Sequence, residues 1–456
     1  MSLLTITAIA WLTVRDAIRS RLLISLTAIL LVGLIGLPLL ISGDNTLRGQ
    51  VQVILGYTLS FAMNMLSAVT LWVACGGIAS EIQDRRLYLV LTKPVHRHEL
   101  WLGKWLGIVG INAMLLGLTG LILTTMIWRT LRVSPESAET KREIGEQFLL
   151  ARQPLPPSLP DWSGLAKRES EKLVSSGKAP AGMDRRAIES ELMKEYERRQ
   201  WTVLPNGAIA LDYQLPAPAT GAHDLILTYS FESSRPERTP VAAAWRIDTV
   251  PDRSLVMEVT NYPGMPNTIL IPGSLVQGSQ AIRLTYHRLD AQNPATLMMT
   301  AGGTQPELLV PTGNGTPNLT RGLLIILFRL AFLAALGLTA GCLLSAPVAV
   351  FVAFFVMILL AMSGYVENVA TSGVFYVAHE GPAPTQTWLD VAILRLFKGF
   401  NGVTQPFIRF DPVPLLQEGK RVGWDLTVYA AAWLIGLYTT LTALIGIALF
   451  NRREIG

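Results

Sequence analysis

Long uninterrupted apolar runs dominate the pattern of hydrophobic and polar positions along this chain. A helix that crosses a bilayer needs roughly 20 consecutive apolar residues, because it rises about 1.5 Å per residue across about 30 Å of hydrocarbon. Six runs meet this requirement: Leu22–Ile41, Val51–Ala79, Leu106–Ile127, Gly322–Leu344, Ala346–Tyr365 and Leu426–Phe450. The pattern therefore predicts an α-helical polytopic membrane protein with six transmembrane helices.

The segment before the first run, residues 1–21, has a different pattern. Between residues 3 and 18 the apolar side chains fall loosely on one broad helical face, with Trp11 among them and Arg15 and Arg19 close by. A helix of this kind lies in the membrane interface, where Trp sits at headgroup level and Arg faces phosphates. We therefore predict an interfacial amphipathic helix. The alternative is a simple continuation of the first span.

Residues 129–321, between the third and fourth runs, predict a domain of their own. Residues 129–200 are charged and interrupted by prolines, and "DRRAIESELMKEYERRQ" carries Ile188, Leu192 and Tyr196 at four-residue spacing, which favours helices. Residues 201–310 alternate short β-branched and aromatic segments with Pro, Gly, Asn and Ser turns. This second pattern is typical of an antiparallel β-sandwich or jelly roll.

Two roles are open for the aromatic residues of this domain, stacking on a carbohydrate or filling a core. Aromatic side chains at strand spacing belong to cores far more often. The residues concerned are Trp201, Tyr229, Trp245, Tyr262 and Tyr286.

Charge sets the expected orientation. Only 16% of the residues are charged, against about a quarter in soluble domains, and Lys and Arg in short loops mark the cytoplasmic side. Basic residues gather before the first run, between the second and third, and after the sixth, which six spans place on one side. We predict a multi-pass protein of the cell inner (cytoplasmic) membrane with N- and C-termini in the cytoplasm.

The predicted segments follow from these boundaries. They are 1–21, the interfacial helix; 22–128, transmembrane helices 1–3 with a cytoplasmic loop at 80–105; 129–321, an extracytoplasmic domain; 322–365, transmembrane helices 4–5; 366–424, an extracytoplasmic loop; and 425–456, transmembrane helix 6 and the cytoplasmic tail.

The densest mixed-charge stretch is "EIQDRRLYLVLTKPVHRHELWLGKWLG", Glu81–Gly107, between the second and third runs. A mere tether would be rich in Gly and Ser, without a pattern. Here charged and apolar groups alternate as far as Pro94, which suits a short surface helix, and Trp101 and Trp105 follow as expected interfacial anchors. Such a helix, joined to two spans, can pass a push from a soluble partner into both.

The order of residues in this loop resembles that of type-2 ABC transporter permeases, the ABC-2 family of membrane subunits. The matching positions are Glu81, Leu89, Leu91, Pro94, Val95, Arg97, Leu102, Gly103 and Lys104. The interfacial helix, the six spans and "LSAPVAV" between spans four and five are also similar to this family, and the copper-site maturation permeases of nitrous oxide reductase are similar in overall plan. Two features depart from the family: Arg86-Leu87 replaces the usual Gly-Thr, and the large external domain is extra.

The resemblance implies a coupling loop that sits in a cleft of a cytoplasmic ABC-type ATPase and transmits its closure. It implies that three arginines meet acidic rims of the ATPase and three leucines fill its groove: Arg85, Arg86, Arg97, Leu87, Leu89 and Leu91. It also implies two ATPase copies and a second permease protomer, identical or a related chain. The alternative is a solvated charged loop without a partner.

Motifs for chemistry within the chain are missing. No G-x-x-x-x-G-K-[ST] phosphate loop occurs, so ATP hydrolysis is expected in a separate subunit and the chain is not expected to be an enzyme. His96 and His98 flank Arg97, whose charge opposes a bound cation. Cys75 and Cys342 lie inside predicted spans and are expected to be small apolar filler. No metal, cofactor or nucleic acid is expected, and membrane lipids are the remaining partners.

Polar residues inside the spans are further candidates, because their burial in lipid costs free energy. Asn64 and Asn112 are expected to form interhelical hydrogen bonds. Arg329, in span four, has three interpretations: its guanidinium reaches lipid phosphate, pairs with Glu367 at the outer end of span five, or contacts an anionic substrate.

The residues and the resemblance together favour a permease subunit of an ATP-binding-cassette transporter, an exporter coupled to a separate ATPase. Two alternatives stay open. One is a membrane-anchored binding or scaffolding protein whose external domain does the work. The other is a mechanotransmission subunit, in which ATP use moves the external domain and nothing crosses the membrane.

Overall fold

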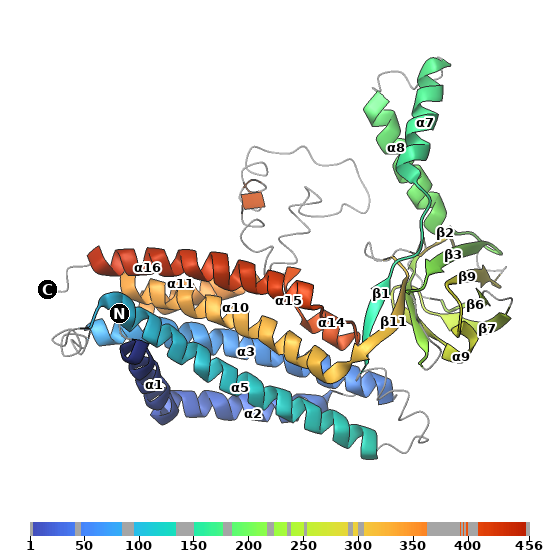
Figure 1. Ribbon diagram of the computed structural model, residues 1–456. Coiled ribbons are helices and arrows are strands. Elements are labelled where there is room, and N and C mark those ends of the chain that lie inside the picture. The colour runs from blue at the N-terminus through green and yellow to red at the C-terminus, as the bar shows by residue number, and fades with distance from the viewer. Residues whose placement is uncertain are drawn as a thin grey trace. The chain divides into compact units, whose positions relative to one another are not determined.

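Two compact units make up the chain (Figure 1). The membrane unit comprises Met1–Ala151 and Asn314–Gly456, and the sheet unit comprises Arg152–Gly313. The computed structural model describes residues 3–41, 47–83, 95–133, 150–176, 185–216, 223–234, 239–249, 253–290, 295–299, 305–362, 393, 395, 398–399 and 409–452.

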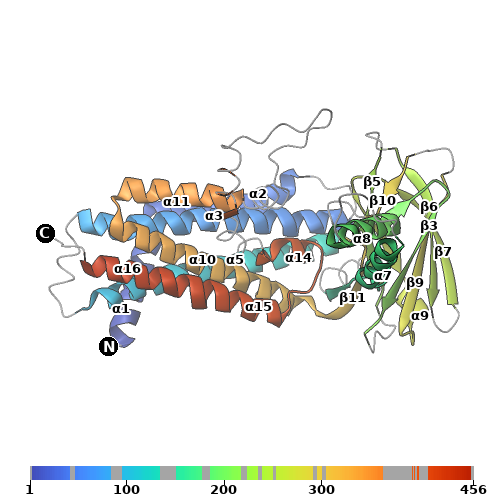
Figure 2. The same cartoon turned by 90° about the horizontal axis from the view of Figure 1, so that it is seen from above.

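Long helices run side by side in the membrane unit, and a short N-terminal helix crosses them near one end (Figures 1 and 2). They are α1 (Leu3–Arg19), α2 (Arg21–Leu40), α3 (Leu47–Gln83), α5 (Arg97–Val133), α10 (Gly315–Leu343), α11 (Ala346–Ala361), α14 (Val413–Gln417), α15 (Trp424–Ala430), the π-helical segment η2 (Ala431–Thr439) and α16 (Thr440–Arg452). We call the end where α3 ends and α5 begins the loop end.

Five helices in the described part of the chain are long and apolar enough to cross a membrane. Four of them cover the first four predicted runs to within one residue at the C-terminal end, and the continuous helix of α15, η2 and α16 contains the sixth. The fifth run is represented by α11, which has 16 residues, and its expected end at Tyr365 lies outside the described residues. The count of six spans therefore remains a prediction.

The two central helices extend beyond their predicted runs. α3 and α5 have 37 residues each, about 55 Å of helix at 1.5 Å per residue. This length exceeds the roughly 40–45 Å of a bilayer with its headgroups. A helix of this length that stood upright in a bilayer would extend past its surface.

The N-terminal helix is separate from the first span. Ser20 between them has extended backbone, with φ −70° and ψ 123°, which interrupts the helical hydrogen bonding. In α1 the apolar Ile6 is buried, whereas the apolar Leu4 and Trp11 are exposed. The alternative of one continuous helix over residues 3–40 is therefore wrong.

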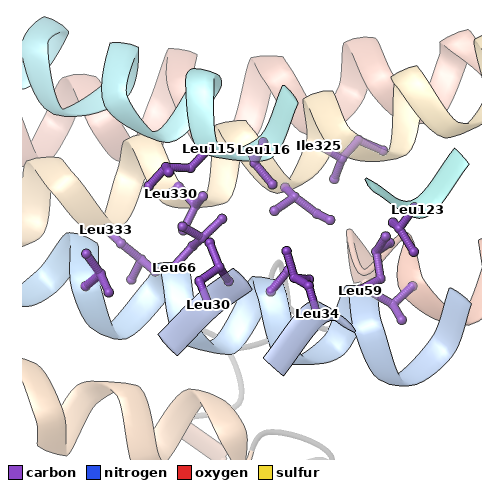
Figure 3. Close-up of a cluster of buried hydrophobic side chains, with 14 of the residues drawn as sticks. Leu30, Leu34, Leu59, Leu66, Leu115, Leu116, Leu123, Ile325, Leu330 and Leu333 are labelled. Atoms are coloured by element: carbon purple, nitrogen blue, oxygen red, sulfur yellow. The ribbon is translucent and has the colours of Figure 1, made fainter. Parts of the chain in front are cut away.

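Leucine and isoleucine side chains from four helices fill the middle of the membrane unit (Figure 3). They include Leu30 and Leu34 of α2, Leu59 and Leu66 of α3, Leu115, Leu116 and Leu123 of α5, and Ile325, Leu330 and Leu333 of α10. Lipid chains are as apolar as these side chains, so helix association in a membrane depends on packing contact instead of transfer from water.

Glycines allow the closest of these helix contacts. A β-carbon at Gly337 of α10 would lie 2.7 Å from the β-carbon of Ala74, and one at Gly341 would lie 2.6 Å from the carbonyl oxygen of Cys75. The four-residue spacing puts both glycines on one face, as in the small-residue pairs of membrane helices. Cys75 and Cys342 are both buried.

Residues 409–423, just before α15, pack against the bundle at the end opposite the loop end. Asn318 of α10 is 5% exposed; its amide donates to the carbonyl of Lys420 at 2.9 Å and accepts from the N–H of Val422 at 2.7 Å. Leu416 lies where a β-carbon at Gly322 would be only 2.5 Å away. Residues 409–423 are thus held against α10 by packing and backbone hydrogen bonds.

The last long helix changes its winding in the middle. Between Ala431 and Thr439 it is π-helical, and the Thr439 hydroxyl donates to the carbonyl of Leu434, five residues back, at 2.7 Å. Trp433 and Tyr438 lie with ring centroids 6.1 Å apart, and Tyr438 lies 5.8 Å from Phe332 of α10. The two aromatic residues therefore share one face despite their five-residue spacing.

Two four-stranded sheets and one three-stranded sheet form most of the sheet unit. The first has the order β1 (Leu150–Leu155), β11 (Glu307–Asn314), β4 (Leu225–Ser230), β8 (Pro266–Ile271). The second has the order β3 (Ala208–Gln214), β9 (Ala281–Arg288), β6 (Val241–Thr249), β7 (Arg253–Asn261). The small one joins β2 (Thr202–Val203), β10 (Leu297–Met298) and β5 (Glu232–Ser233). The single turn of α9 is Gly273–Val276.

The β-rich region predicted at 201–310 is present, and the region 129–200, predicted to contain helical pieces, also contains a strand at residues 150–155. Strand β1 forms there and pairs with β11, near the other end of the insert. Its sequence, LARQPL, has too few β-branched residues to indicate a strand by itself. A long-range pairing with β11 therefore overrides the local preference.

One aromatic core lies between the two four-stranded sheets. The Tyr229 ring of β4 meets the Trp245 ring of β6 at 5.1 Å, and Trp245 meets Tyr286 of β9 at 5.2 Å. Asn261 joins the two tyrosines, since its amide oxygen accepts from the Tyr229 hydroxyl at 2.7 Å and its amide nitrogen donates to the Tyr286 oxygen at 3.0 Å. These rings are core residues and are not available for stacking on a sugar.

Two other aromatic residues had the same two expected roles, in a core or on a carbohydrate. Trp201 is also buried in this core. Tyr262 is 50% exposed and remains the only residue of the five whose ring is open to solvent.

A helical hairpin adds to the sheets. It consists of α7 (Trp162–Ser175) and α8 (Arg185–Trp201) and projects from the strands (Figure 1). The Trp162 and Tyr196 rings stack with centroids 5.7 Å apart, and the Tyr196 hydroxyl donates to Glu169 at 2.9 Å. Contacts between the two helices therefore hold the hairpin together.

We predict that the sheet unit loses stability between pH 10 and pH 12. Burial raises the pKa of Tyr213 and Tyr229 above the usual value and raises the pKa of Tyr286 to about 12. In the unfolded chain these groups ionise near pH 10, so the stabilisation is complete below pH 10 and is lost as the pH rises toward the folded-state values. For Tyr286 alone the loss is about 3 kcal/mol.

Urea unfolding of the full chain, followed at pH 9 and at pH 11, measures this effect. Tyr286→Phe should start from lower stability, because Asn261 loses a partner, but should show a shallower fall with pH. Equal unfolding midpoints at the two pH values would contradict the prediction.

Candidate functional site

The predicted coupling loop is described on its two flanks. Glu81 lies in the last turn of α3, before the loop, and the other described candidates lie in the first turns of α5, after it: Arg97, Gly103 and Lys104. Six candidate residues of the loop lie outside the described residues: Arg85, Arg86, Leu87, Leu89, Leu91 and Pro94. Glu367, the expected partner of Arg329, lies outside them too.

An ion pair joins the two flanks. The Lys104 Nζ atom of α5 donates to Glu81 Oε1 of α3 at 2.6 Å. The Lys104 side chain is 11% exposed and that of Glu81 is 34% exposed. Because both groups are partly withdrawn from water, the attraction is screened less than on an open surface. The pair therefore fixes the spacing of consecutive spans where the loop leaves them.

Two glycines of α5 bring α1 against the same flank. A β-carbon at Gly103 would lie 2.6 Å from the β-carbon of Ile9, and one at Gly107 would lie 2.6 Å from the β-carbon of Thr13 and 2.9 Å from the carbonyl oxygen of Ala10. Real side chains do not fit at these distances. The two glycines of "GKWLG" are thus the points at which α5 contacts α1.

The first turn of α5 is closed by a reciprocal cap. The Glu99 carboxylate accepts from the N–H of His96 at 3.2 Å, while the His96 carbonyl accepts from the N–H of Glu99 at 3.0 Å. This exchange resembles a capping box. The His96 and His98 rings stack at 5.3 Å. Among the described residues, no group of three or more His, Cys, Asp and Glu side chains could hold a metal ion.

Arg97 has a structural partner in this chain. Its Nη1 atom donates to the carbonyls of Phe450 at 2.5 Å and of Asn451 at 3.2 Å, and its guanidinium lies 5.5 Å from the Phe450 ring centre. A cation at a helix C-terminus satisfies free carbonyls and complements the helix dipole. Arg97 therefore caps α16, while its expected contact with an acidic ATPase rim stays a prediction.

Of the two tryptophans expected at the interface, Trp101 lies inside the bundle and Trp105 is half-buried. Trp101 is 1% exposed and packs with Phe450 and Leu338. The Trp105 Nε1 atom donates to the carbonyl of Ala331 in α10 at 2.8 Å. Interfacial anchoring is therefore wrong for Trp101, because the helix face that carries it is turned toward α10 and α16; for the half-buried Trp105 it stays a prediction.

The two asparagines inside the spans behave differently. The Thr70 hydroxyl of α3 donates to Asn112 Oδ1 of α5 at 3.0 Å, and Asn112 is 2% exposed. Asn112 thus links two helices, as expected. The Asn64 amide donates to the carbonyl of Ser60 in its own helix at 2.9 Å and the side chain is exposed, so the expected interhelical bond is absent from the described residues.

Arg329 meets an unforeseen partner. Its Nη1 atom lies 3.7 Å from Asp411 Oδ1 and 3.3 Å from the sulfur of Met63. The side chain of Arg329 is 13% exposed and that of Asp411 is 31% exposed. The same carboxylate accepts from the N–H of Val413 at 3.0 Å. Arg329 therefore ties α10 to the segment that precedes α14.

The predictions from the sequence did not include three features of these sites: two glycine pairs and Asp411. The pairs Gly103/Gly107 and Gly337/Gly341 both follow the G-x-x-x-G pattern, a signal of close helix contact. Asp411 carried no comparable signal, because 82 residues separate it from Arg329.

The five helices of the described part of the chain that are long and apolar enough to cross a membrane support a membrane-embedded protein. Residues 7–140 match the family model described as ABC-2 family transporter protein. The match covers α2, α3, α5 and most of α1, 134 of 456 residues. It supports a membrane-embedded ABC-2 type permease, a family whose membrane subunits generally partner with a cytoplasmic ATPase. Comparison with the curated proteins and with the solved structures gave no match.

We predict that Gly103→Ala releases α1 from α5. The new methyl group would overlap Ile9, and overpacking of this kind costs about 1–3 kcal/mol, so hydrogen exchange of the α1 amides should accelerate about tenfold or more. Gly110→Ala is the matched control, because the nearest atom to its β-carbon would be 3.9 Å away. Exchange rates in α1 that are equal for the two variants would contradict the assignment.

We also predict that Glu81→Gln destabilises the membrane unit by about 1–3 kcal/mol, since it leaves the Lys104 ammonium largely buried without its anion. Exchanging the two residues, as Glu81→Lys with Lys104→Glu, should restore most of the loss. Unfolding in detergent measures the coupling. It is followed for Glu81→Gln, for Glu81→Lys and Lys104→Glu separately, and for the exchanged double variant. Single variants as stable as the parent would show that the pair contributes nothing.

Proposed function

We propose that this chain is the permease subunit of an ABC transporter, driven through the Glu81–Lys104 loop by a separate cytoplasmic ATPase. The family match over residues 7–140 supports the class. The observation that carries the coupling role is the Glu81–Lys104 ion pair, which connects α3 and α5 at the base of the loop.

The geometry of the flanks favours force transmission. A push on residues 84–94 acts on the ends of α3 and α5 together, because the ion pair resists their separation. The Gly103 and Gly107 contacts carry the displacement from α5 into α1. Trp105 and Arg97 connect α5 to α10 and α16. One loop would thus move α3 and α5 and, through α5, three further helices: α1, α10 and α16.

The finer parts of the proposal come from the sequence. The chain would lie in the cell inner membrane with both termini in the cytoplasm, pair with a second protomer, bind two ATPase copies and work as an exporter. Basic residues flanking the predicted cytoplasmic loops support this orientation. The absence of a phosphate-loop sequence supports a separate motor.

Specific interhelical contacts favour a permease over a plain anchor. Helices that only hold an external domain need no partly buried Glu81–Lys104 pair and no Thr70–Asn112 hydrogen bond. The mechanotransmission alternative uses the same loop, and the separate core of the sheet unit suits a part that is moved as a body.

We further propose that the sheet unit is a jelly roll. The support is its nested pairing: β6 with β7, β4 with β8, β3 with β9 and β1 with β11. A single long hairpin wrapped into two sheets has this order, and jelly rolls are double-sheet folds of eight strands.

The experiment for the main proposal reverses charge in the loop. We expect that Arg85→Glu with Arg86→Glu releases a co-purifying phosphate-loop ATPase from the tagged chain in mild detergent, while the chain stays folded. The reason is that two attractive contacts with acidic rims become repulsive. The measurement is the ATPase-to-permease ratio after affinity purification.

Arg198→Glu with Arg199→Glu is the matched control, because both arginines are exposed on the hairpin helix α8 and far from the loop in sequence. An ATPase that is released equally by both double variants, or by neither, would remove the loop from the coupling role. Co-purification of no ATPase in several detergents would favour the anchored binding protein.

A further inference from the structure

A pocket of about 430 Å³ opens at the loop end of the membrane unit. It lies between α1, α2, α3, α5 and α10, and most of its wall is apolar: Ile9, Leu12, Val73, Leu100, Ile108 and Leu338. Its volume is within the range of about 300–1,000 Å³ typical of small-molecule sites. Neither the loop nor the helix contacts described above require a cavity here.

The polar part of the lining is unbalanced in charge. Asp16, Glu81 and Lys104 line the pocket together with the hydroxyl groups of Thr13 and Ser20. Lys104 is engaged by Glu81 at 2.6 Å, so the two carboxylates and one ammonium leave one formal negative charge, on Asp16. Asp16 is exposed and forms no ion pair with any residue that the structure describes.

A cation stands one helical turn beyond Asp16. Arg19 follows it by three residues in α1, which places the two side chains on neighbouring parts of the helix surface. Arg19 is also exposed and has no ion pair within the described ranges. The pocket thus offers a carboxylate at the edge of an apolar chamber, and the guanidinium of Arg19 stands one helical turn further along α1, outside the lining.

We propose that this pocket binds the headgroup and upper acyl chain of an aminophospholipid. The protonated primary amine would donate to Asp16 and to hydroxyl oxygens of the lining, and the adjacent phosphate would pair with Arg19. The acyl chain would lie against the apolar wall. A primary amine fits better than choline, because a quaternary ammonium has no N–H to donate.

The membrane is the source of this ligand. The pocket is walled by helices long and apolar enough to span a bilayer, and α1 exposes Leu4, Trp11 and Leu12 beside it, as an interfacial helix does. The site goes beyond the proposed function and needs no ATPase, so binding can be tested on the purified chain alone.

The test uses photoactivatable lipids. The full chain is placed in phosphatidylcholine nanodiscs containing a trace of phosphatidylethanolamine with a diazirine in its acyl chain, or the matching phosphatidylcholine probe. Cross-linked peptides are mapped by mass spectrometry. We expect the ethanolamine probe to label the peptides carrying Leu12, Val73 and Leu338 about tenfold more than the choline probe, the effect of one charge-assisted hydrogen bond.

Two variants separate the pocket from its charge. Gly77→Leu should abolish this labelling by filling the pocket, whereas Gly76→Leu should not, because a β-carbon at either position meets nothing within 4 Å but only Gly77 lines the pocket. Asp16→Asn should lower ethanolamine labelling to the choline level, with exchange of the α1 amides unchanged.

Three results would overturn the inference. Equal labelling by the two probes would mean general acyl contact without headgroup recognition. Unchanged labelling in Gly77→Leu would place the bound lipid elsewhere. Unchanged labelling in Asp16→Asn would remove the amine contact.

Discussion

Close backbone contact at glycine is the condition on which the membrane unit depends. Lipid offers helices no hydrophobic gain from pairing, so they associate where their surfaces approach closely. Gly337 and Gly341 let α10 meet α3, and Gly103 and Gly107 let α1 meet α5. The interhelical hydrogen bonds and ion pairs span fixed short distances, so each of them requires this approach.

Polar contacts divide the bundle into two differently built ends. At the loop end, Glu81–Lys104 and the Arg97 cap connect elements through charges. At the opposite end, Arg329–Asp411 and the Asn318 hydrogen bonds hold residues 409–423 in place. In a medium of low polarity each partner would be costly to leave unpaired. The charged residues named here therefore have a structural role in holding the helices together.

The sequence was informative where hydropathy decides the structure and silent where distance along the chain matters. The apolar runs predicted the long helices, and the break before the first run predicted α1. Glycines inside an apolar run hardly change its hydropathy, so the α1–α5 contact went unnoticed. The partners of Arg97 and Arg329 lie 353 and 82 residues away, and no local pattern indicates such a pairing.

The same reasoning separates parts of the candidate site. The motif positions Glu81 and Lys104 were chosen by resemblance, and the structure brings them into contact. Arg97 matched the motif equally well, but its guanidinium serves the last helix. A match to the motif therefore identifies the position of a residue in the chain, whereas the contacts of its side chain in the structure indicate its role.

The π-helical segment has a consequence for the last helix as a whole. In an α-helix, residues five apart point about 140° away from each other, so Trp433 and Tyr438 would diverge. The wider turn aligns them and also rotates everything that follows, including Phe450, whose carbonyl receives Arg97. One continuous helix can therefore present matching side chains to two neighbours that an unbroken α-helix could not face at once. The part before η2 and the part after it contact different residues, and η2 sets the rotation between them.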